Sequence, residues 1–244
     1  MSRLPDSVAG MLSYCVQAQL QGSLNPSCYM ISESIAQACE ELGIEAEVMF
    51  ADAYAWNIDA QRLLKSDRLF RKWSRRDRIG FKARRKMRKI RPKFVGIYNG
   101  QDVEGPGYNG HVVVRIEGEM VDCTIHQFTR PDYNLNAPDV AVIPMKEFTD
   151  MEDEIRNGDT KTPAGNLLTK TMIDEVSVTP EMTIQPFPND GGYMLYSIRR
   201  GLEKDYFDFS PETRDNIRRL KEDLVRIGQA IIDGRTKLVE PGSE

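Results

Sequence analysis

The chain has 244 residues, 40% of them hydrophobic and 29% charged, with a formal net charge of −4. These values lie in the globular range, and the length allows one large domain or two small ones with a buried core. No apolar run approaches the about 20 residues that a membrane-spanning helix needs, and the first residues lack the basic-then-apolar pattern of a secretion signal. The four cysteines lack the regular spacing of a disulfide framework. We therefore expect a cytoplasmic protein with reduced thiols and no membrane contact.

The charge is distributed unevenly along the chain. The segment from Arg62 to Lys93 contains 16 Lys or Arg and 2 Asp, a net +14, which leaves −18 for the remainder. Such a split indicates either a basic element that matches an acidic body or a surface for an anionic partner.

The N-terminal part is predicted to hold two helices and a strand. Residues 6–21 carry an apolar stripe at helical spacing. Asn25, Pro26 and Ser27 form a helix start, because Asn or Ser can cap and Pro suits the first turn. The helix that follows begins with Cys28 and ends near Gly43. Alternating apolar and acidic residues then predict a half-buried strand over 44–50.

The rest of the chain is predicted to add a sheet and further helices. We expect a basic helical segment over 57–91, a strand over 93–98, a Gly-rich loop over 99–110 and a hairpin of strands 112–116 and 120–124. A strand over 140–144 and an acidic helix over 145–156 should follow. The C-terminal part should consist of loops over 157–192, with a short strand near 173–178, and of helices over 192–204 and 210–233.

Cys28 has the position expected of a reactive thiol. A free thiol is only a few per cent ionised at neutral pH, and the positive end of a helix favours the thiolate. Cys15 and Cys39 lie mid-helix among apolar residues, which is typical of small core residues. The chain has only two histidines, His111 and His126, so few candidates exist for a base that takes the thiol proton.

The predicted hairpin brings a histidine and a carboxylate onto one face of the sheet. If Gly118 and Glu119 form the turn, Asp122 faces Arg115, and His111 lies on the same face as Asp122 but four residues away, about 13 Å along flat strands. Strong twist, a bulge or a wider loop would have to shorten this distance. Asp122 could instead pair with Arg115 across the hairpin.

These motifs resemble the transglutaminase-like branch of the papain-like cysteine enzymes. The order is Cys28 at a helix start, Gly110-His111 leading an apolar strand, then Asp122-Cys123-Thr124 followed by Gln127-Phe128. The resemblance covers about Asn25–Gly43 and Gly110–Phe128. It implies an α+β fold with a papain-like, transglutaminase-like core, in which a helix carrying Cys packs on an antiparallel sheet carrying His and Asp, with helical additions.

The resemblance also implies roles for individual residues. Cys28 would be the nucleophile, His111 the base and Asp122 the carboxylate that orients it, in acyl transfer or hydrolysis through a thioester. The Cys28 backbone N–H would contribute to an oxyanion site, with Gln21 as a further candidate. We take Gln21, Gln127 and Trp56 as candidates for substrate binding.

Two other uses of the second histidine follow from its position. His126 could replace His111 as the base. The spacing Cys123-x-x-His126 would suit a metal, but the sequence holds no second ligand pair for a closed zinc site, so we expect no metal and no cofactor.

We predict that residues 1–150 form the core, interrupted by a basic helical insertion at about 57–93, and that 151–244 form a loop-rich and helical extension packed on it. The expected activity is that of a peptidase, deamidase or transglutaminase-type enzyme, with a protein or peptide as substrate. The alternative is a protein with an inactive core that binds nucleic acid or another polyanion through residues 62–93. The candidate contacts are Arg84, Arg85, Lys86, Arg88, Lys89 and Arg91.

Overall fold

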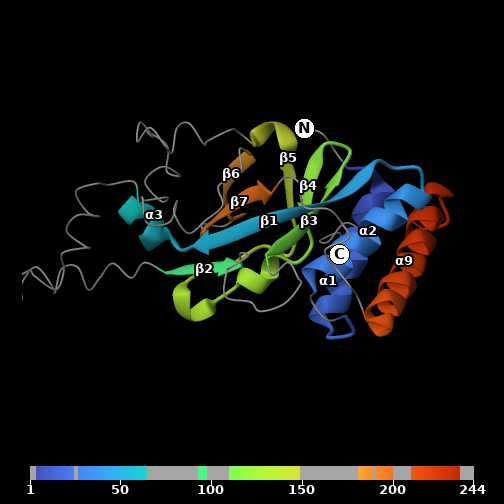
Figure 1. The fold of residues 1–244 in the computed structure, drawn as a ribbon, viewed down its shortest axis with the longest axis horizontal. Helices are drawn as coiled ribbons and strands as arrows, with labels where there is room; N and C mark the ends of the chain where they lie inside the picture. The colour runs from blue at the N-terminus through green and yellow to red at the C-terminus, as the bar shows by residue number, and fades with distance from the viewer. Residues whose placement is uncertain are drawn as a thin grey trace, which may run out of the picture.

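The computed structural model is a mixed α+β structure built on one curled antiparallel sheet (Figure 1). It describes residues 4–24, 27–64, 93–97, 110–148, 181–188, 191–199 and 210–236. In these residues no helix is long and apolar enough to cross a membrane.

The helices are α1 (Asp6–Leu20), α2 (Cys28–Glu41), α3 (Ile58–Leu64) and α9 (Pro211–Ile232), and short 3-10 turns span Ile125–Phe128 (η2), Pro131–Tyr133 (η3) and Met145–Glu147 (η4). The strands are β1 (Ala46–Trp56), β2 (Phe94–Ile97), β3 (His111–Ile116), β4 (Glu119–Asp122), β5 (Ala141–Pro144), β6 (Glu181–Pro186) and β7 (Tyr193–Arg199). They are arranged in the order β5-β4-β3-β1-β7-β6, and β2 also pairs with β1.

The long strand β1 organises the sheet. Its first half, 46–51, pairs with β3, and its second half, 53–56, pairs with β2. Its other side pairs with β7 over 50–56. β3 and β2 thus follow one another along one edge of β1, and β7 lies along the other edge. Both the hairpin with His111 and the C-terminal strands are therefore fixed to β1.

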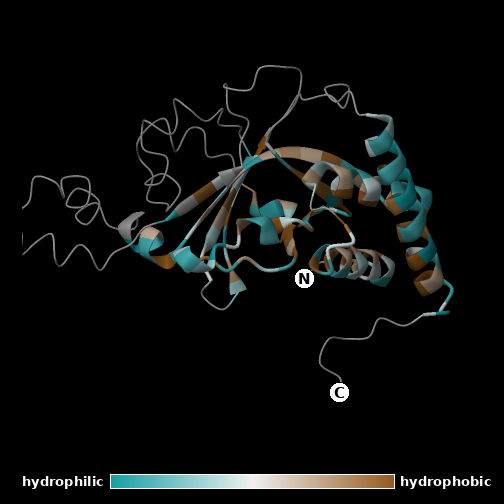
Figure 2. Cartoon of the chain, turned by 90° about the horizontal axis from the view of Figure 1, so that it is seen from below, coloured by the Kyte–Doolittle hydropathy of each residue, from teal (hydrophilic) through white to brown (hydrophobic). Residues whose placement is uncertain are grey.

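Three helices, α1, α2 and α9, group together at one end of the sheet (Figure 1), where α2 packs on β3 and β1 and α9 packs on the other two helices. The apolar stripe of α2, with Ile31 and Ile35 fully buried, packs on Val112 and Val114 of β3. The outermost helix, α9, contributes Leu224 to this core and shows mostly hydrophilic colours elsewhere in Figure 2. Amphipathic helices with such stripes gain stability by burying them.

A second apolar core lies on the opposite face of the sheet. Its members come from β1, β3, β4 and β7 and from the segment after β4, and they include Val113, Met120, Phe128 and Met194. The central strands are therefore buried on both faces, and polar side chains placed there need internal partners.

The structure confirms the predicted helices at 6–21 and 210–233, the helix that begins at Cys28, and the hairpin. The predicted helix over 192–204 is wrong, because residues 193–199 form strand β7. Of the helix expected over 145–156, residues 145–147 form the 3-10 turn η4 and those from 149 on lie outside the described residues. Strands β6 and β7, which come from the segment expected to form the extension, belong to the same sheet as β1.

Candidate active site

Cys28 is the first residue of α2. Ser27 is the N-cap, and its hydroxyl accepts a hydrogen bond from the backbone N–H of Met30 at 3.4 Å while its carbonyl accepts one from Ile31 at 3.0 Å. The thiol is partly buried against the helical core. The positive end of the helix dipole therefore lies beside this sulfur, as the sequence predicted.

The hairpin has a different register from the expected one. Its turn is Glu117–Gly118, both with positive φ (50° and 81°), and Val114 lies opposite Val121. Continuing this register places Asp122 opposite Val113, so it is offset from His111 by two residues instead of four. Such diagonal neighbours on adjacent strands lie about 7–8 Å apart, a distance that long side chains can bridge.

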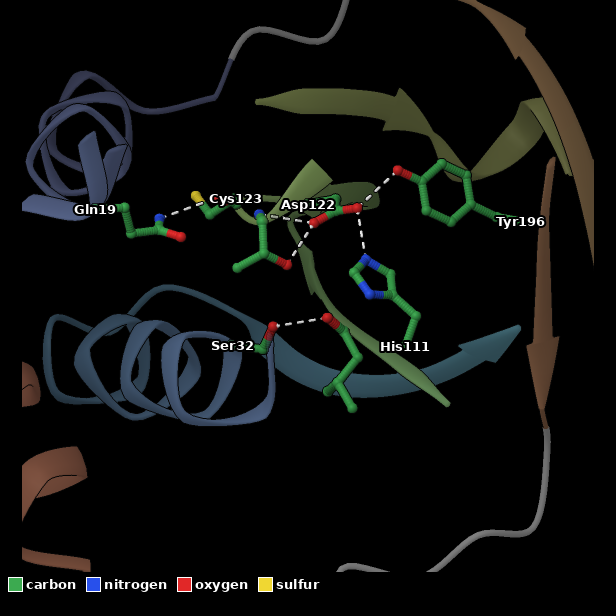
Figure 3. A network of polar contacts seen from close by, with 8 residues as sticks. Gln19, Ser32, His111, Asp122, Cys123 and Tyr196 are labelled. Carbon is green, nitrogen blue, oxygen red and sulfur yellow. Dashed lines mark hydrogen bonds and ion pairs between the residues drawn. The ribbon is translucent and has the colours of Figure 1, made fainter. Parts of the chain in front are cut away.

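His111 and Asp122 form a buried pair (Figure 3). The distance from His111 Nε2 to Asp122 Oδ2 is 2.7 Å, and the two side chains are fully buried. The same Oδ2 accepts a hydrogen bond from the Tyr196 hydroxyl at 2.8 Å, and Oδ1 accepts bonds from the Thr124 backbone N–H at 2.8 Å and from its hydroxyl at 3.0 Å. Four protein donors thus stabilise the carboxylate.

This pairing shifts the pKa values of both partners. Burial by itself raises the pKa of Asp122, but the charge of His111 and the hydrogen bonds from His111, Tyr196 and Thr124 outweigh burial and lower that pKa. Burial likewise lowers the pKa of His111, and the charge and hydrogen bond of Asp122 overcome this and raise it, with a smaller contribution from Cys28. The pair therefore favours an imidazolium beside a carboxylate.

The two ring nitrogens of His111 differ in their surroundings. Nε2 is held by Asp122, whereas Nδ1 is buried and makes no hydrogen bond of regular geometry to the described residues. Cys28 interacts with this ring and adds to the rise in its pKa. The edge of Phe128 meets the ring in a T-shaped contact with centroids 5.5 Å apart, which shields it from solvent.

The other three thiols are buried and are poor nucleophiles. Burial raises the pKa of Cys15 and of Cys39 to about 12 and that of Cys123 well above 9. They stay protonated at neutral pH. Cys28 is thus distinguished by its place at the helix start and its interaction with His111.

Two further hydrogen bonds tie the helices to the strands that carry the pair (Figure 3). The Ser32 hydroxyl of α2 donates to the carbonyl of Val112 at 3.1 Å, next to His111. The Gln19 amide of α1 donates to the carbonyl of Cys123 at 3.0 Å, next to Asp122. The spacing between Cys28 and the pair therefore depends on side-chain bonds as well as on apolar packing.

Asp122 does not form the cross-strand pair with Arg115 that the sequence also allowed. Asp122 bonds His111 and not His126, which is half-buried on η2. Arg115 forms ion pairs with Glu47 and Glu45, so it does not pair with Asp122.

The predicted substrate contacts lie on three different elements. Gln21 is the exposed C-cap of α1, and Gln127 is partly buried on η2. Trp56 is fully buried, donates to Gln61 at 2.7 Å and stacks on Tyr193, so it is a core residue with no surface to offer a substrate.

Tyr196 was missed by the sequence prediction because its segment was expected to be helical. The signal was present as the run Tyr193-Met194-Leu195-Tyr196-Ser197-Ile198, which is rich in strand formers and follows two glycines. The basic candidates Arg84, Arg85, Lys86, Arg88, Lys89 and Arg91 lie outside the described residues.

No known family model, curated protein or solved structure matches the chain. Within the described ranges no three His, Cys, Asp or Glu side chains gather as they would around a metal ion.

Proposed function

We propose that the protein is a thiol enzyme that cleaves or transfers an acyl group from an amide through a thioester. The observation that carries this proposal is the buried bond between His111 Nε2 and Asp122 Oδ2, which leaves Nδ1 without a hydrogen-bond partner among the described residues, while Cys28 at the start of α2 interacts with the same ring. A helix carrying the Cys against an antiparallel sheet carrying His and Asp is also the arrangement expected of a papain-like, transglutaminase-like core.

In the proposed reaction the Cys28 proton already rests on His111 Nδ1, and the thiolate sulfur attacks the amide carbonyl. The C–N bond then breaks as Nδ1 returns this proton to the leaving amine, and the thioester remains. Water or an amine attacks the thioester, again losing its proton to Nδ1, and the thiol is restored. Asp122 stays an anion throughout and holds the ring by Nε2.

The test measures how fast iodoacetamide alkylates each cysteine between pH 4 and 10, with the sites assigned by mass spectrometry. We expect Cys28 to react well below the pH typical of a free thiol. His111→Ala should move its profile upward, because the imidazolium that stabilises the thiolate is then lost. Cys15, Cys39 and Cys123 serve as internal controls that should label slowly in the folded protein.

The matched control is His126→Ala, which removes the other histidine and should leave the Cys28 profile unchanged. An ordinary thiol profile for Cys28 in the wild type and in both variants would contradict the proposed enzyme activity. The basic segment at 62–93 would then become the next region to test, for polyanion binding.

A further inference from the structure

Tyr196 comes from the C-terminal part of the chain and reaches the centre of the site. It lies on β7, with its side chain fully buried in the core on the face of the sheet opposite the helices. Its hydroxyl donates to Asp122 Oδ2 at 2.8 Å, the same oxygen that His111 Nε2 contacts at 2.7 Å. Figure 3 shows both rings directed at this one carboxylate.

The other donors to Asp122 are local to the hairpin. Thr124 follows Asp122 by two residues and occupies Oδ1 with its N–H and hydroxyl, and His111 is on the neighbouring strand β3. Of the four described donors, the Tyr196 hydroxyl is therefore the one that β7 supplies. It acts on the oxygen that sets the orientation and basicity of His111.

We propose that Tyr196 is a positioning residue of the thiol site, which fixes Asp122 Oδ2 as an anion and thereby keeps the exchangeable proton on His111 Nδ1. This inference rests on the proposed function. The geometry supports it because one carboxylate oxygen shared by two donors is less able to take the proton from His111 Nε2.

The chemistry of the phenol agrees with this role. Burial and the charge of Asp122 raise the pKa of Tyr196 well above 10, so its hydroxyl remains a donor over the working range of a thiol enzyme. In turn, the hydrogen bond from Tyr196 lowers the pKa of Asp122. Removing the hydroxyl should therefore make Asp122 easier to protonate.

The test is the alkylation profile of Cys28 in Tyr196→Phe. Without this hydrogen bond Asp122 takes the Nε2 proton more readily, which removes positive charge beside the sulfur, so the alkylation profile should move to higher pH by about one unit. Tyr193→Phe, which removes a hydroxyl from the same strand, is the matched control and should leave the profile unchanged. Loss of stability alone, without a shifted profile in the folded protein, would overturn the positioning role.

A second measurement uses the wild-type protein and does not depend on how the variant folds. Tyr196 Oη–H and His111 Nε2–H donate to one oxygen, so their protons should show a nuclear Overhauser effect, and absence of this effect between two observed resonances would overturn the proposal.

Failure of the proposed function and failure of the role of Tyr196 are distinguishable. If His111→Ala shifts the Cys28 profile but Tyr196→Phe does not, the thiol site stands without Tyr196. If neither shifts it, both proposals fall.

Discussion

At the scale of residues, the site depends on a charged pair in a place where water is excluded. An ionised carboxylate without partners would be very costly at this depth, and here four donors compensate it. The same contacts that hold the His111 ring therefore also stabilise the fold, so stability and the proposed chemistry depend on one network.

The pKa shifts of this pair predict how stability depends on pH. The raised pKa of His111 gives a contribution that is fully present below about pH 6.5, its unfolded value, and is lost as the pH rises through the folded pKa. The lowered pKa of Asp122 gives a contribution that is present above about pH 3.8 and is lost as the pH falls through its folded pKa. The pair therefore stabilises the protein most between these two values.

We expect His111→Gln to lower the free energy of unfolding most near pH 5, by about 2 kcal/mol or more, and less at pH 9. Urea unfolding of wild type and variant at several pH values measures this difference. His126→Gln is the matched control at the half-buried histidine. A His111→Gln effect that is constant with pH, or that grows toward pH 9, would contradict the raised pKa.

At the scale of elements, the start of α2 determines where the thiol lies. The Ser27 hydroxyl holds the N–H of Met30, and Ser32 one turn later holds the carbonyl beside His111. A weakened first turn would move Cys28 relative to the ring without touching the His111–Asp122 pair.

The chain offers a matched pair of caps to test this. Ser27 caps α2, and Ser210 caps α9 by accepting a hydrogen bond from the N–H of Thr213 at 3.2 Å. Ser27→Ala and Ser210→Ala should each lower the free energy of unfolding by about 1 kcal/mol. Only Ser27→Ala should also slow the alkylation of Cys28 at neutral pH. Equal reactivity in the two variants would show that the helix start does not activate this thiol.

The hairpin shows why the sequence placed the right residues at the wrong distance. A two-residue turn of this kind needs positive φ at both central positions, and Gly118 accepts it at little cost whereas Glu117 does not. Both Glu117–Gly118 and Gly118–Glu119 therefore remain compatible with the sequence, and the choice changes the offset between His111 and Asp122 from four residues to two. Cross-strand packing, which a single sequence does not display, decides between them.

Tyr196 shows a different limit of sequence prediction. Its strand is apolar from Tyr193 to Ile198 except for Ser197, and successive residues Met194, Leu195 and Tyr196 are all fully buried, so its hydrophobic pattern has no period that separates strand from helix. The place of Cys28 at the start of α2 could be predicted because a helix cap depends on residues that are adjacent in the sequence. The partner of Asp122 from β7 could not be, because it is separated by 74 residues and depends on which strand lies beside β1.

At the scale of the whole molecule, the described N-terminal and C-terminal parts form one unit. β7 pairs with β1 over seven residues, Phe50 to Trp56, and α9 packs on both α1 and α2. The fully buried side chains of Leu224 on α9 and Met194 on β7 would be lost together with Tyr196 if the chain ended early. Without these elements one edge of β1 and much of the apolar core would be exposed.

We therefore expect a chain that ends at residue 150 to lose cooperative thermal unfolding and selective labelling of Cys28, because its remaining core is too small to offset chain entropy. A chain that ends at residue 236, which retains α9, is the matched control and should behave as the full chain does. Circular dichroism melting curves and cysteine labelling measure the two properties. Supplying residues 151–244 in trans should restore both if the missing strands are the cause. A cooperative, selectively labelled 1–150 fragment would instead support the division at residue 150 and remove Tyr196 from the site.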